Sequence, residues 1–292
     1  MFFQQLVNGI TIGCTYSLVA IGFTMIFGVL ELVNFSNSSV YMMGAYVTLM
    51  IYLAFGGYFM VALVMSLIVM GLVGFCIDRF GLRRLRDKKA PRLTGLMTTM
   101  GISTMMDNFI LLFFGSETKS FPNLMDFGSF EVGSVVISWI QICILVITLL
   151  LMGLLSLLVY QTKLGKAMLA VAQNPDAAKL MGIDVNRIIS ITFIISALLA
   201  TVAGVLNGMY YQSIDINMGA SVGNKTFASA VLGGVGVLPG AMIGGLLVGI
   251  IETLGASYIS SGYRDAIAFI ILILVLLIRP TGLFGKKQIN KV

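Results

Sequence analysis

Residues 169–184 read LAVAQNPDAAKLMGID, a short polar stretch in a chain of 292 residues that is otherwise very apolar. Two long segments flank it, Val136–Val159 and Ile188–Tyr211, and neither contains a charged residue. The whole chain is 58% hydrophobic and 10% charged, with a mean hydropathy of +1.01. Soluble domains carry about 25% charged residues, and apolar runs of about 20 residues are typical of transmembrane helices. The composition therefore predicts a membrane protein.

Further apolar runs occur along the chain, the last of them shorter than the others. They are Met1–Leu30, Leu32–Ile77, Leu93–Phe114, Thr226–Ile251 and Ala266–Ile278. These runs are continuous and do not alternate with a period of two, which argues against a β-barrel. We therefore predict an all-α polytopic membrane protein of about eight hydrophobic segments, forming a single transmembrane domain over residues 1–292.

The positions of the charges predict the topology. One short loop carries seven basic residues: Arg79, Arg83, Arg84, Arg86, Lys88, Lys89 and Arg92. A second basic group lies within or beside residues 169–184: Lys163, Lys166, Lys179 and Arg187. A third lies near the end of the sequence: Arg279, Lys286, Lys287 and Lys291. Short loops rich in Lys and Arg face the cytoplasm, so all three regions, including the C-terminus, are placed there. The first loop is also a candidate for binding anionic lipid, although the topological interpretation is preferred.

This topology requires one apolar segment to begin and end on the same side of the membrane. Ile188–Tyr211 leads outward, so Gln212–Lys225 should form a loop on the outside. The last span must lead inward to the basic tail, so Thr226–Ile251 must begin and end outside. A straight helix cannot do that. Its centre, LGGVGVLPGAMIGG, contains proline and several glycines, which break helices. We therefore predict a broken or re-entrant hairpin near 226–251. Broken helices often line the substrate path of transporters.

The early segment ELVNFSNSSVYMMGAY is a second candidate for the substrate path. Counting back from the first basic loop places it near the cytoplasmic end of the first crossing. Its Asn and Ser side chains can cap the following helix, and capping alone is the simpler interpretation. The tentative path residues from both segments are Asn34, Ser36, Asn37, Ser38, Gly233, Gly234, Gly236 and Pro239.

Residues 169–184 contain a compact helix signal. Asn174 can cap a helix, Pro175 fits its first position, and Asp176 suits its positive end. Gly182 is a natural stop. We predict a helix of about two turns, Pro175–Met181, on the cytoplasmic face. A helix this short needs a surface to pack on.

Several stretches together resemble a known family. KLGKAMLAVAQNPDAAKLMGI looks like the coupling segment of inner-membrane ABC importer permeases, and most like that of branched-chain amino acid permeases of the Liv type. LVNFSNSSVYMMGAY, TFASAVLGGVGVLPGAMIGGLLVGIIE, LLIRPTGLFG and QQLVNGITIGCTYSLVAIGFTMIFGVL point to the same family. The resemblance covers essentially the whole chain. One departure is that Asn37 and Ser39 stand where the family usually has His and Glu, which affects the substrate more than the architecture.

The resemblance implies a set of partners. Within the cytoplasmic coupling segment 161–187, the part around Asn174–Gly182 would dock in a groove on one of two cytoplasmic ATPase subunits. These subunits bind ATP and Mg²⁺, while this chain binds no cofactor and has no catalytic role. A second related permease, identical or different, and an extracytoplasmic substrate-binding protein would complete a complex in the bacterial inner membrane. The implied coupling residues are Gly165, Ala172, Asn174, Pro175, Asp176, Ala177, Ala178, Leu180 and Gly182. The substrate would be leucine, isoleucine and valine, with other amino acids or urea and short amides as the alternative.

The residues also allow other classes of function to be weighed. The chain has no phosphate-binding loop of the form GxxxxGK[ST], so ATP would have to bind another chain. With no histidine and no paired Cys, we predict neither a metal site nor an enzyme. A stand-alone secondary transporter would need ionisable groups within the membrane, for which Glu31, Asp107 and Glu252 are the candidates. The charge pattern gives no reason to expect binding to nucleic acid.

Overall fold

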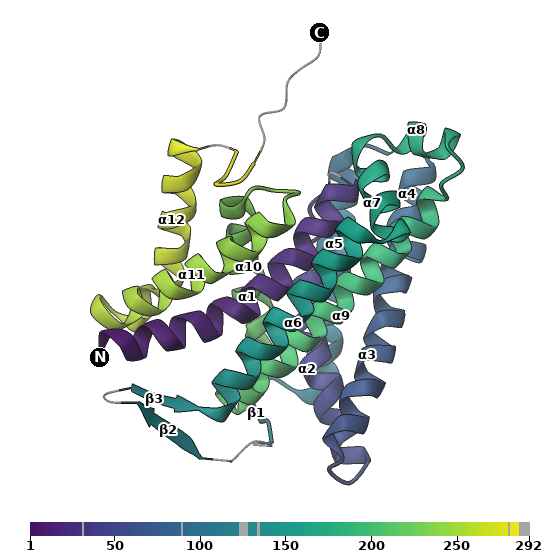
Figure 1. Ribbon diagram of the computed structural model, residues 1–292. Coiled ribbons are helices and arrows are strands. Elements are labelled where there is room, and N and C mark those ends of the chain that lie inside the picture. Colours follow the sequence, from purple (N-terminus) through teal and green to yellow (C-terminus); the bar gives the residue numbers. More distant parts are fainter. Residues whose placement is uncertain (31, 89, 123–127, 133–134, 280, 286–292) are drawn as a thin grey trace.

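Long, tilted helices make up most of the computed structural model (Figure 1). It describes all residues except 31, 89, 123–127, 133–134, 280 and 286–292. Glu31, Lys89 and the lysines after residue 285 therefore lie outside the described residues. Six described helices are long and apolar enough to cross a membrane, so the chain is a multi-pass α-helical membrane protein.

The helices follow one another through short connections. The first half comprises α1 (Phe2–Leu30), α2 (Ser36–Ala54), α3 (Phe59–Cys76), the π-helical turn η1 (Ile77–Leu82), α4 (Arg83–Asp87) and α5 (Arg92–Phe114). The second half comprises α6 (Trp139–Gln161), α7 (Lys163–Gln173), α8 (Pro175–Leu180), α9 (Val185–Tyr211), α10 (Asn217–Gly233), α11 (Leu238–Tyr258), the 3₁₀ turn η2 (Ser261–Tyr263) and α12 (Arg264–Ile278).

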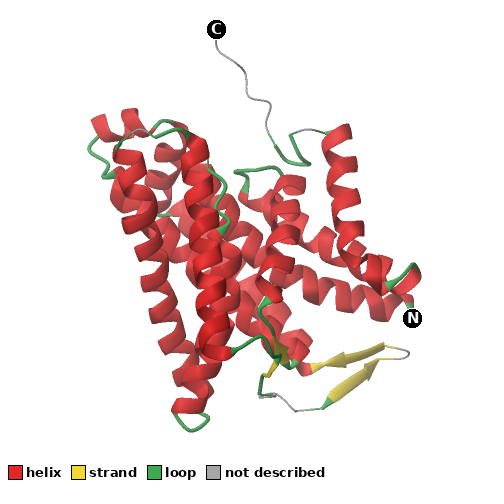
Figure 2. Cartoon of the chain, turned by 180° about the vertical axis from the view of Figure 1, so that it is seen from behind, coloured by secondary structure: helices red, strands yellow, loops and turns green. Residues whose placement is uncertain are grey.

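Two small antiparallel ladders add to the helical fold. Strand β1 (Lys119–Ser120) pairs with β4 (Ser213–Ile214), and β2 (Ser129–Val132) pairs with β3 (Val135–Ser138). Figure 2 shows the strands together at one end of the helices, away from α7 and α8. The predicted span from Val136 begins later than expected, because β3 extends to Ser138 and its N–H binds the Gln141 side chain at the start of α6.

The structure does not confirm the predicted count of about eight segments. Helices α10 and α12 contain 17 and 15 residues, shorter than the roughly 20 residues that a bilayer requires. Helix α2 has 19 residues but is not among the six helices that are both long and apolar enough. The α2–α3 turn lies at Gly56 and Gly57, which adopt the positive φ angles of 67° and 92° that favour glycine.

The core forms around α1 and α9, which the other helices surround. α1 crosses the molecule obliquely and runs antiparallel to α11 over much of its length (Figure 1). A Cβ added to Gly249 would lie 2.3 Å from the Gly13 Cα, and one added to Gly245 would lie 2.5 Å from the Ser17 Cα. Glycine at these positions lets the two backbones meet, as in other membrane helix pairs.

Candidate functional site

The segment between α6 and α9 folds as two short helices. The Thr162 hydroxyl accepts a hydrogen bond from the Gly165 N–H at 3.1 Å and so caps α7. A Cβ on Gly165 would lie 2.2 Å from the carbonyl oxygens of Leu158 and Val159. Any larger residue would push α7 away from the end of α6. Gly165 thus fixes how this segment folds back onto the membrane helices.

Helix α8 confirms the predicted helix signal. The Asn174 Oδ1 accepts hydrogen bonds from the N–H groups of Asp176 and Ala177, both at 3.0 Å. Pro175 occupies the first turn, and Gly182 ends the motif with a φ of 83°. A capping Asn and a stop glycine are therefore enough to define this helix, as the sequence indicated.

The two faces of α8 differ in exposure. Ala178 is 4% exposed and packs inward, whereas Leu180 and Met181 are 89% and 82% exposed. Asn174, Pro175, Asp176, Ala177 and Gly182 are exposed as well, while Ala172 is half-buried. The apolar tip thus consists of Leu180 and Met181. Met181 is absent from the residues that the family resemblance implied, although its position beside the stop glycine was a usable signal.

A polar network connects the start of α9, directly after this segment, to the first basic loop. Asp78 in η1 is fully buried and pairs with Arg86 of α4 at 3.2 Å. Arg86 also donates to the Asn186 Oδ1 of α9 at 2.9 Å, and the Ser190 hydroxyl donates to Asp78. Sequence reasoning missed this network because it joins residues that are far apart in the chain.

The segment 32–38 folds back from the end of α1 toward its middle. The Asn37 amide donates to the Val19 carbonyl of α1 at 3.4 Å and accepts from the Ser196 hydroxyl of α9 at 2.9 Å. Val19 lies about 16 Å along α1 from Leu30 at 1.5 Å per residue. The segment therefore does not stay at the end of the first crossing, where the sequence placed it.

The polar side chains of this segment are hydrogen-bonded to neutral groups, either to one another or to the backbone and α9. The Asn34 Oδ1 accepts from the Ser36 hydroxyl at 2.6 Å and from the Ser36 N–H at 3.2 Å. The Ser38 hydroxyl donates to the Phe35 carbonyl at 2.7 Å. We call Asn34, Ser36, Asn37 and Ser38 the neutral polar cluster. No ionic group takes part in these contacts. The N-cap of α2 is Phe35, which has no side-chain capping hydrogen bond, so the Asn and Ser side chains do not cap α2 as predicted. Asn34 instead binds Ser36 from the residue before the cap.

The glycine-rich break separates α10 from α11 at residues 234–237. Gly234 and Gly236 have φ angles of 106° and 85°, and Pro239 lies in the first turn of α11. A Cβ on Gly233 would lie 2.1 Å from the Gly240 carbonyl oxygen, so the two helices meet directly after the break.

The C-terminal motif satisfies the end of α10. The N–H groups of Leu283 and Phe284 donate to the carbonyls of Leu232 and Gly233 at 2.8 and 3.1 Å. These carbonyls at the end of a helix otherwise lack a partner. The motif LLIRPTGLFG therefore has a structural role at the break.

The structure brings some of the candidate residues together and keeps others apart. Ala172 of α7, Gly28 of α1 and Gly236 line one small cavity, so the coupling segment meets the break. The neutral polar cluster instead contacts α10 farther along, where a Cβ on Gly223 would lie 2.5 Å from the Ser38 Cβ. Gly223 and Gly233 are about 15 Å apart along α10 at 1.5 Å per residue. The two predicted parts of the path are therefore separate.

The candidate ion-coupling residues are in unlike surroundings. Glu252 is fully buried, and its Oε1 lies 2.9 Å from both the Lys225 Nζ and the Arg264 Nε. Lys225 also pairs with Asp265 at 2.8 Å, and the Tyr16 hydroxyl donates to the Glu252 Oε1 at 3.3 Å. Asp107 of α5 is half-buried, and its Oδ1 has no hydrogen-bond partner in the described structure.

The ionic cluster corrects one detail of the sequence analysis. The sequence placed Gln212–Lys225 in an outer loop, but α10 already begins at Asn217 and Lys225 is 6% exposed. Formation of α10 places Lys225 inside the fold. A charge there needs a partner, and Glu252 supplies it. Within the part of the chain that the structure describes, no three His, Cys, Asp or Glu side chains gather in a possible metal site.

Comparison with known proteins places the whole chain in one group. Residues 5–276 match a family model described as the permease component of branched-chain amino acid transport systems. The chain is 43% identical to BraD of Pseudomonas aeruginosa, a high-affinity branched-chain amino acid transport system permease protein, over 100% of this chain and 98% of that protein. It is 40% identical to LivH of Escherichia coli K12, which bears the same description, with the same coverage.

A more distant similarity covers less of the chain. The ribose import permease protein RbsC of Escherichia coli is 29% identical over 128 residues, which span 41% of this chain and 40% of that protein. No solved structure matches the chain.

Proposed function

Because the chain belongs to the family of branched-chain amino acid transport permeases, we propose that it is the membrane-spanning subunit of an ATP-driven importer of leucine, isoleucine and valine. Its role is to form the translocation path in a bacterial inner membrane. It is not an enzyme: ATP and Mg²⁺ bind to two cytoplasmic ATPase subunits. A second permease of the same kind and an extracytoplasmic binding protein complete the assembly.

The observation that carries the proposal is the exposed apolar tip of α8. Leu180 and Met181 are 89% and 82% exposed at the end of a loop, where an apolar pair gains nothing from water. In the proposed complex both side chains enter a groove on the ATPase. Helix α7 then transmits ATPase movement to α1 and to the break at Gly236, whose residues share a cavity with Ala172.

The arrangement of the helices supports the proposed orientation. α4, α7 and α8 lie at one end of the molecule, opposite the strands and the α2–α3 turn (Figure 1). We assign this basic end, and with it the C-terminus, to the cytoplasm. Helices α10 and α11 then form a hairpin that begins and ends toward the outside, with its break near the cytoplasmic end of α1, where Gly28 approaches Gly236.

The neutral polar cluster is the proposed lining for a zwitterionic substrate. An amino acid carries both charges, so a path without fixed ions avoids trapping either one. The first turn of α2 supplies N–H groups and a partial positive charge for the carboxylate. The Ser36 hydroxyl oxygen is the acceptor for the ammonium group, because the Asn34 Oδ1 already accepts two hydrogen bonds from Ser36.

The test is a pair of charged substitutions at the tip. We would purify Leu180→Asp/Met181→Asp with the co-expressed ATPase subunits. We would then measure how much ATPase stays bound and by what factor leucine increases the rate of ATP hydrolysis. We expect both to fall at least tenfold, because burying an unpaired carboxylate in the ATPase groove costs more than 1.4 kcal/mol. The matched control, Phe55→Asp/Tyr58→Asp, places two carboxylates on exposed apolar positions in the α2–α3 turn.

The two variants separate the importer from a secondary transporter. If the tip variant retains the ATPase and its stimulation, α8 does not couple the subunits and the proposal is wrong. Uptake by the permease alone, driven by an ion gradient, would also contradict it. Glu252 is a poor proton carrier for such a mechanism, because Lys225 and Arg264 already compensate its charge.

A further inference from the structure

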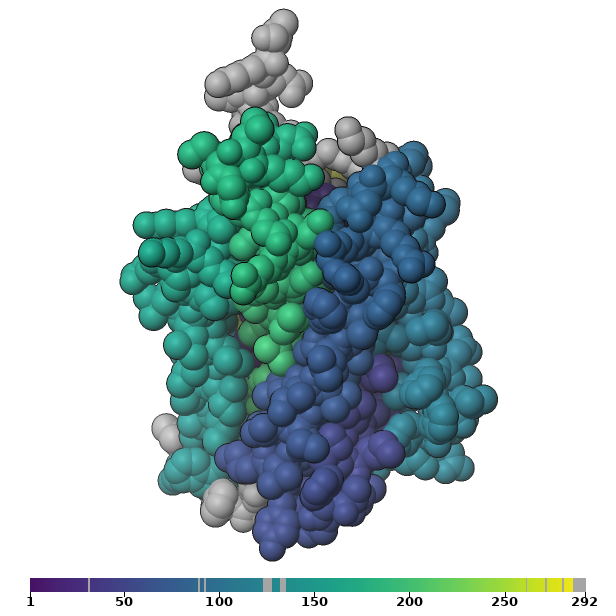
Figure 3. Space-filling view, turned by 90° about the vertical axis from the view of Figure 1, so that its right-hand side faces the viewer, coloured from purple at the N-terminus to yellow at the C-terminus, as the bar shows by residue number. Residues whose placement is uncertain are grey.

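An apolar groove runs between α3 and α5 on the outer surface of the helices. Its volume is about 860 Å³, within the range of about 300–1,000 Å³ typical of ligand pockets. Val69, Leu72 and Phe80 line one side, and Ile102, Met105 and Phe109 line the other. In Figure 3, α3 lies at the front with α5 beside it, so the groove opens toward the surroundings of the protein.

The groove ends at a hollow lined by three arginines. Arg79, Arg83 and Arg84 surround a space of about 350 Å³, with Asp87 as its acidic member. Arg84 and Phe80 line both the hollow and the groove, so the two spaces are continuous. Arg86 belongs to a different contact, because it is bound to Asp78 and Asn186.

The π-helical turn η1 explains why the arginines face the same space. In an α-helix, Arg79 and Arg84 would point about 140° apart, because they are five residues apart in sequence. A π-helical turn is wider and brings residues that are five apart closer to one face, and η1 spans Ile77–Leu82, which includes Arg79 and ends before Arg83 and Arg84. Such turns inside α-helices are frequent at functional sites.

The combination determines the chemistry of the occupant. An apolar groove in a membrane attracts an acyl chain only weakly, because lipid tails are as apolar as the leucines that line it. Selectivity therefore depends on the hollow, where guanidinium groups match the geometry of phosphate. Basic pockets at the ends of transmembrane helices are known to bind anionic head groups.

We propose that this groove binds an anionic glycerophospholipid, with one acyl chain between α3 and α5 and its phosphate at Arg79, Arg83 and Arg84. The bound lipid fastens the end of α3 to α5 beside the Asp78–Arg86 contact. The site depends on the chain lying in a membrane and is independent of the transported substrate.

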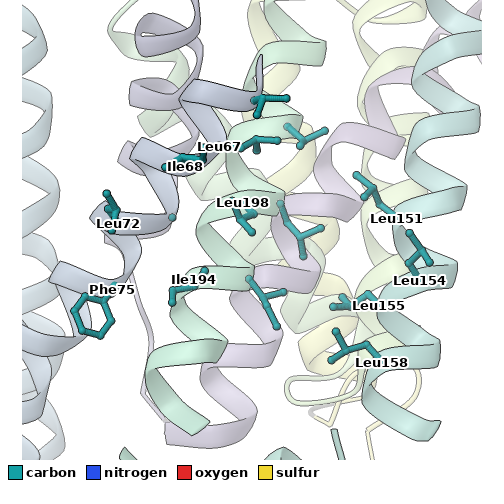
Figure 4. Close-up of a pocket in the computed structure, with 15 residues that line it drawn as sticks. Leu67, Ile68, Leu72, Phe75, Leu151, Leu154, Leu155, Leu158, Ile194 and Leu198 are labelled. Atoms are coloured by element: carbon teal, nitrogen blue, oxygen red, sulfur yellow. The ribbon is translucent and has the colours of Figure 1, made fainter. Parts of the chain in front are cut away.

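The chain contains its own comparison in a second groove of nearly equal size. This groove has a volume of about 850 Å³ and lies between α3 and α6 over α9. The side chains shown in Figure 4, among them Leu72, Leu154 and Leu198, are entirely hydrocarbon. No charged residue lines it, so we expect any acyl chain there to bind without preference for its head group.

Lipid retention by the whole complex tests the proposal. We would purify the permease with its partner subunits, equilibrate it with equal amounts of dioleoylphosphatidylglycerol and dioleoylphosphatidylcholine, and count the retained lipids by mass spectrometry. The wild type should prefer phosphatidylglycerol. Arg79→Gln/Arg83→Gln/Arg84→Gln should lower that preference about fivefold for each arginine removed. The control Lys286→Gln/Lys287→Gln/Lys291→Gln removes equal charge near the end of the sequence, outside the coupling segment, and should leave the preference unchanged.

A second pair of variants tests the groove itself without changing charge. Met105→Trp fills the groove between α3 and α5 and should release phosphatidylglycerol, whereas Leu198→Trp in the hydrocarbon groove should not. Unchanged retention in the arginine or Met105 variants overturns the proposal, as does equal loss in the lysine control. Displacement of the lipid by glycerophosphoglycerol would show a site for free phosphates instead. If Met105→Trp releases the second permease and leaves lipid bound, the groove is a subunit interface.

Discussion

Helices α1 and α5 are both apolar enough to cross a membrane, yet they occupy opposite environments. α1 is buried along nearly its whole length, whereas most of α5 is exposed. Polar side chains occur in both. Those of α1, such as Thr15 and Ser17, are buried and hydrogen-bonded within the chain. Thr104 and Asn108 of α5 face outward and bond only to their own helix.

This difference indicates which helix surfaces are covered within the subunit and which remain free to contact a partner. A buried helix uses its polar and small residues to fix the packing of its own subunit. Polar groups facing lipid are costly and normally turn toward protein or water. The exposed polar face of α5 therefore fits the proposed second permease, while α1 forms the rigid centre.

The largest effect should come from removing the carboxylate beside α1. Glu252→Gln leaves Lys225 and Arg264 without their shared anion, and breaking a buried pair costs about 3–5 kcal/mol. We expect a marked fall in the thermal midpoint of the detergent-purified permease. Size-exclusion chromatography of heated samples would measure this midpoint. Asp107→Asn on α5 removes a carboxylate that has no ion pair in the described structure, and should change stability by about 0.5 kcal/mol or less.

Equal midpoints for these two variants would contradict the contrast between the helices. The triple variant Lys225→Met/Glu252→Leu/Arg264→Met adds a check, because replacing Glu252 and both of its cationic partners with apolar groups often restores stability. A triple variant as unstable as Glu252→Gln would show that packing, not charge, holds this region.

A smaller effect is expected from adding one methyl group to a glycine on each side of the comparison. In Gly249→Ala, the new Cβ would lie 2.3 Å from the Gly13 backbone, and such overpacking costs about 1–3 kcal/mol. In Gly101→Ala on α5, nothing lies within 4 Å of the new Cβ, so the helix should gain about 0.5–1 kcal/mol. Thermal midpoints of the two variants should therefore move in opposite directions. A loss at Gly101 in the isolated permease would show that α5 packs more tightly than its exposure indicates.

Much of the fold could be predicted because it depends on local signals. Uninterrupted apolar runs mark the long helices, and Asn174, Pro175 and Gly182 define α8 through capping and turn geometry. The glycines at 56–57 and 234–236 mark breaks, since positive φ angles favour glycine. The short helices α10 and α12 were harder to assess, because length and hydropathy alone do not show how a broken segment crosses a membrane.

The contacts between distant residues could not be predicted from the same signals. Lys225 looked like a loop residue because its partners, Glu252 and Asp265, follow much later in the chain. The depth of Asn37 also depends on contacts with Val19 and Ser196 that no local pattern encodes. The exposure of Leu180 and the burial of Ala178 depend on how α7 and α8 pack, which a two-turn helix does not determine alone.

The smallest stability change, and the most informative for assembly, is expected on the polar face of α5. Thr104→Val/Asn108→Leu should leave the isolated permease within about 0.5 kcal/mol of the wild type, since both side chains are exposed. Hydrogen bonds between membrane helices contribute about 0.6 kcal/mol on average, or about threefold in binding for each bond lost. Copurification of the second permease should therefore fall about tenfold if both side chains bond across the interface. Leu112→Met, another exposed position on α5, serves as the control. If assembly is unchanged while the permease itself becomes less stable, the polar face of α5 packs within its own subunit and the contrast with α1 disappears.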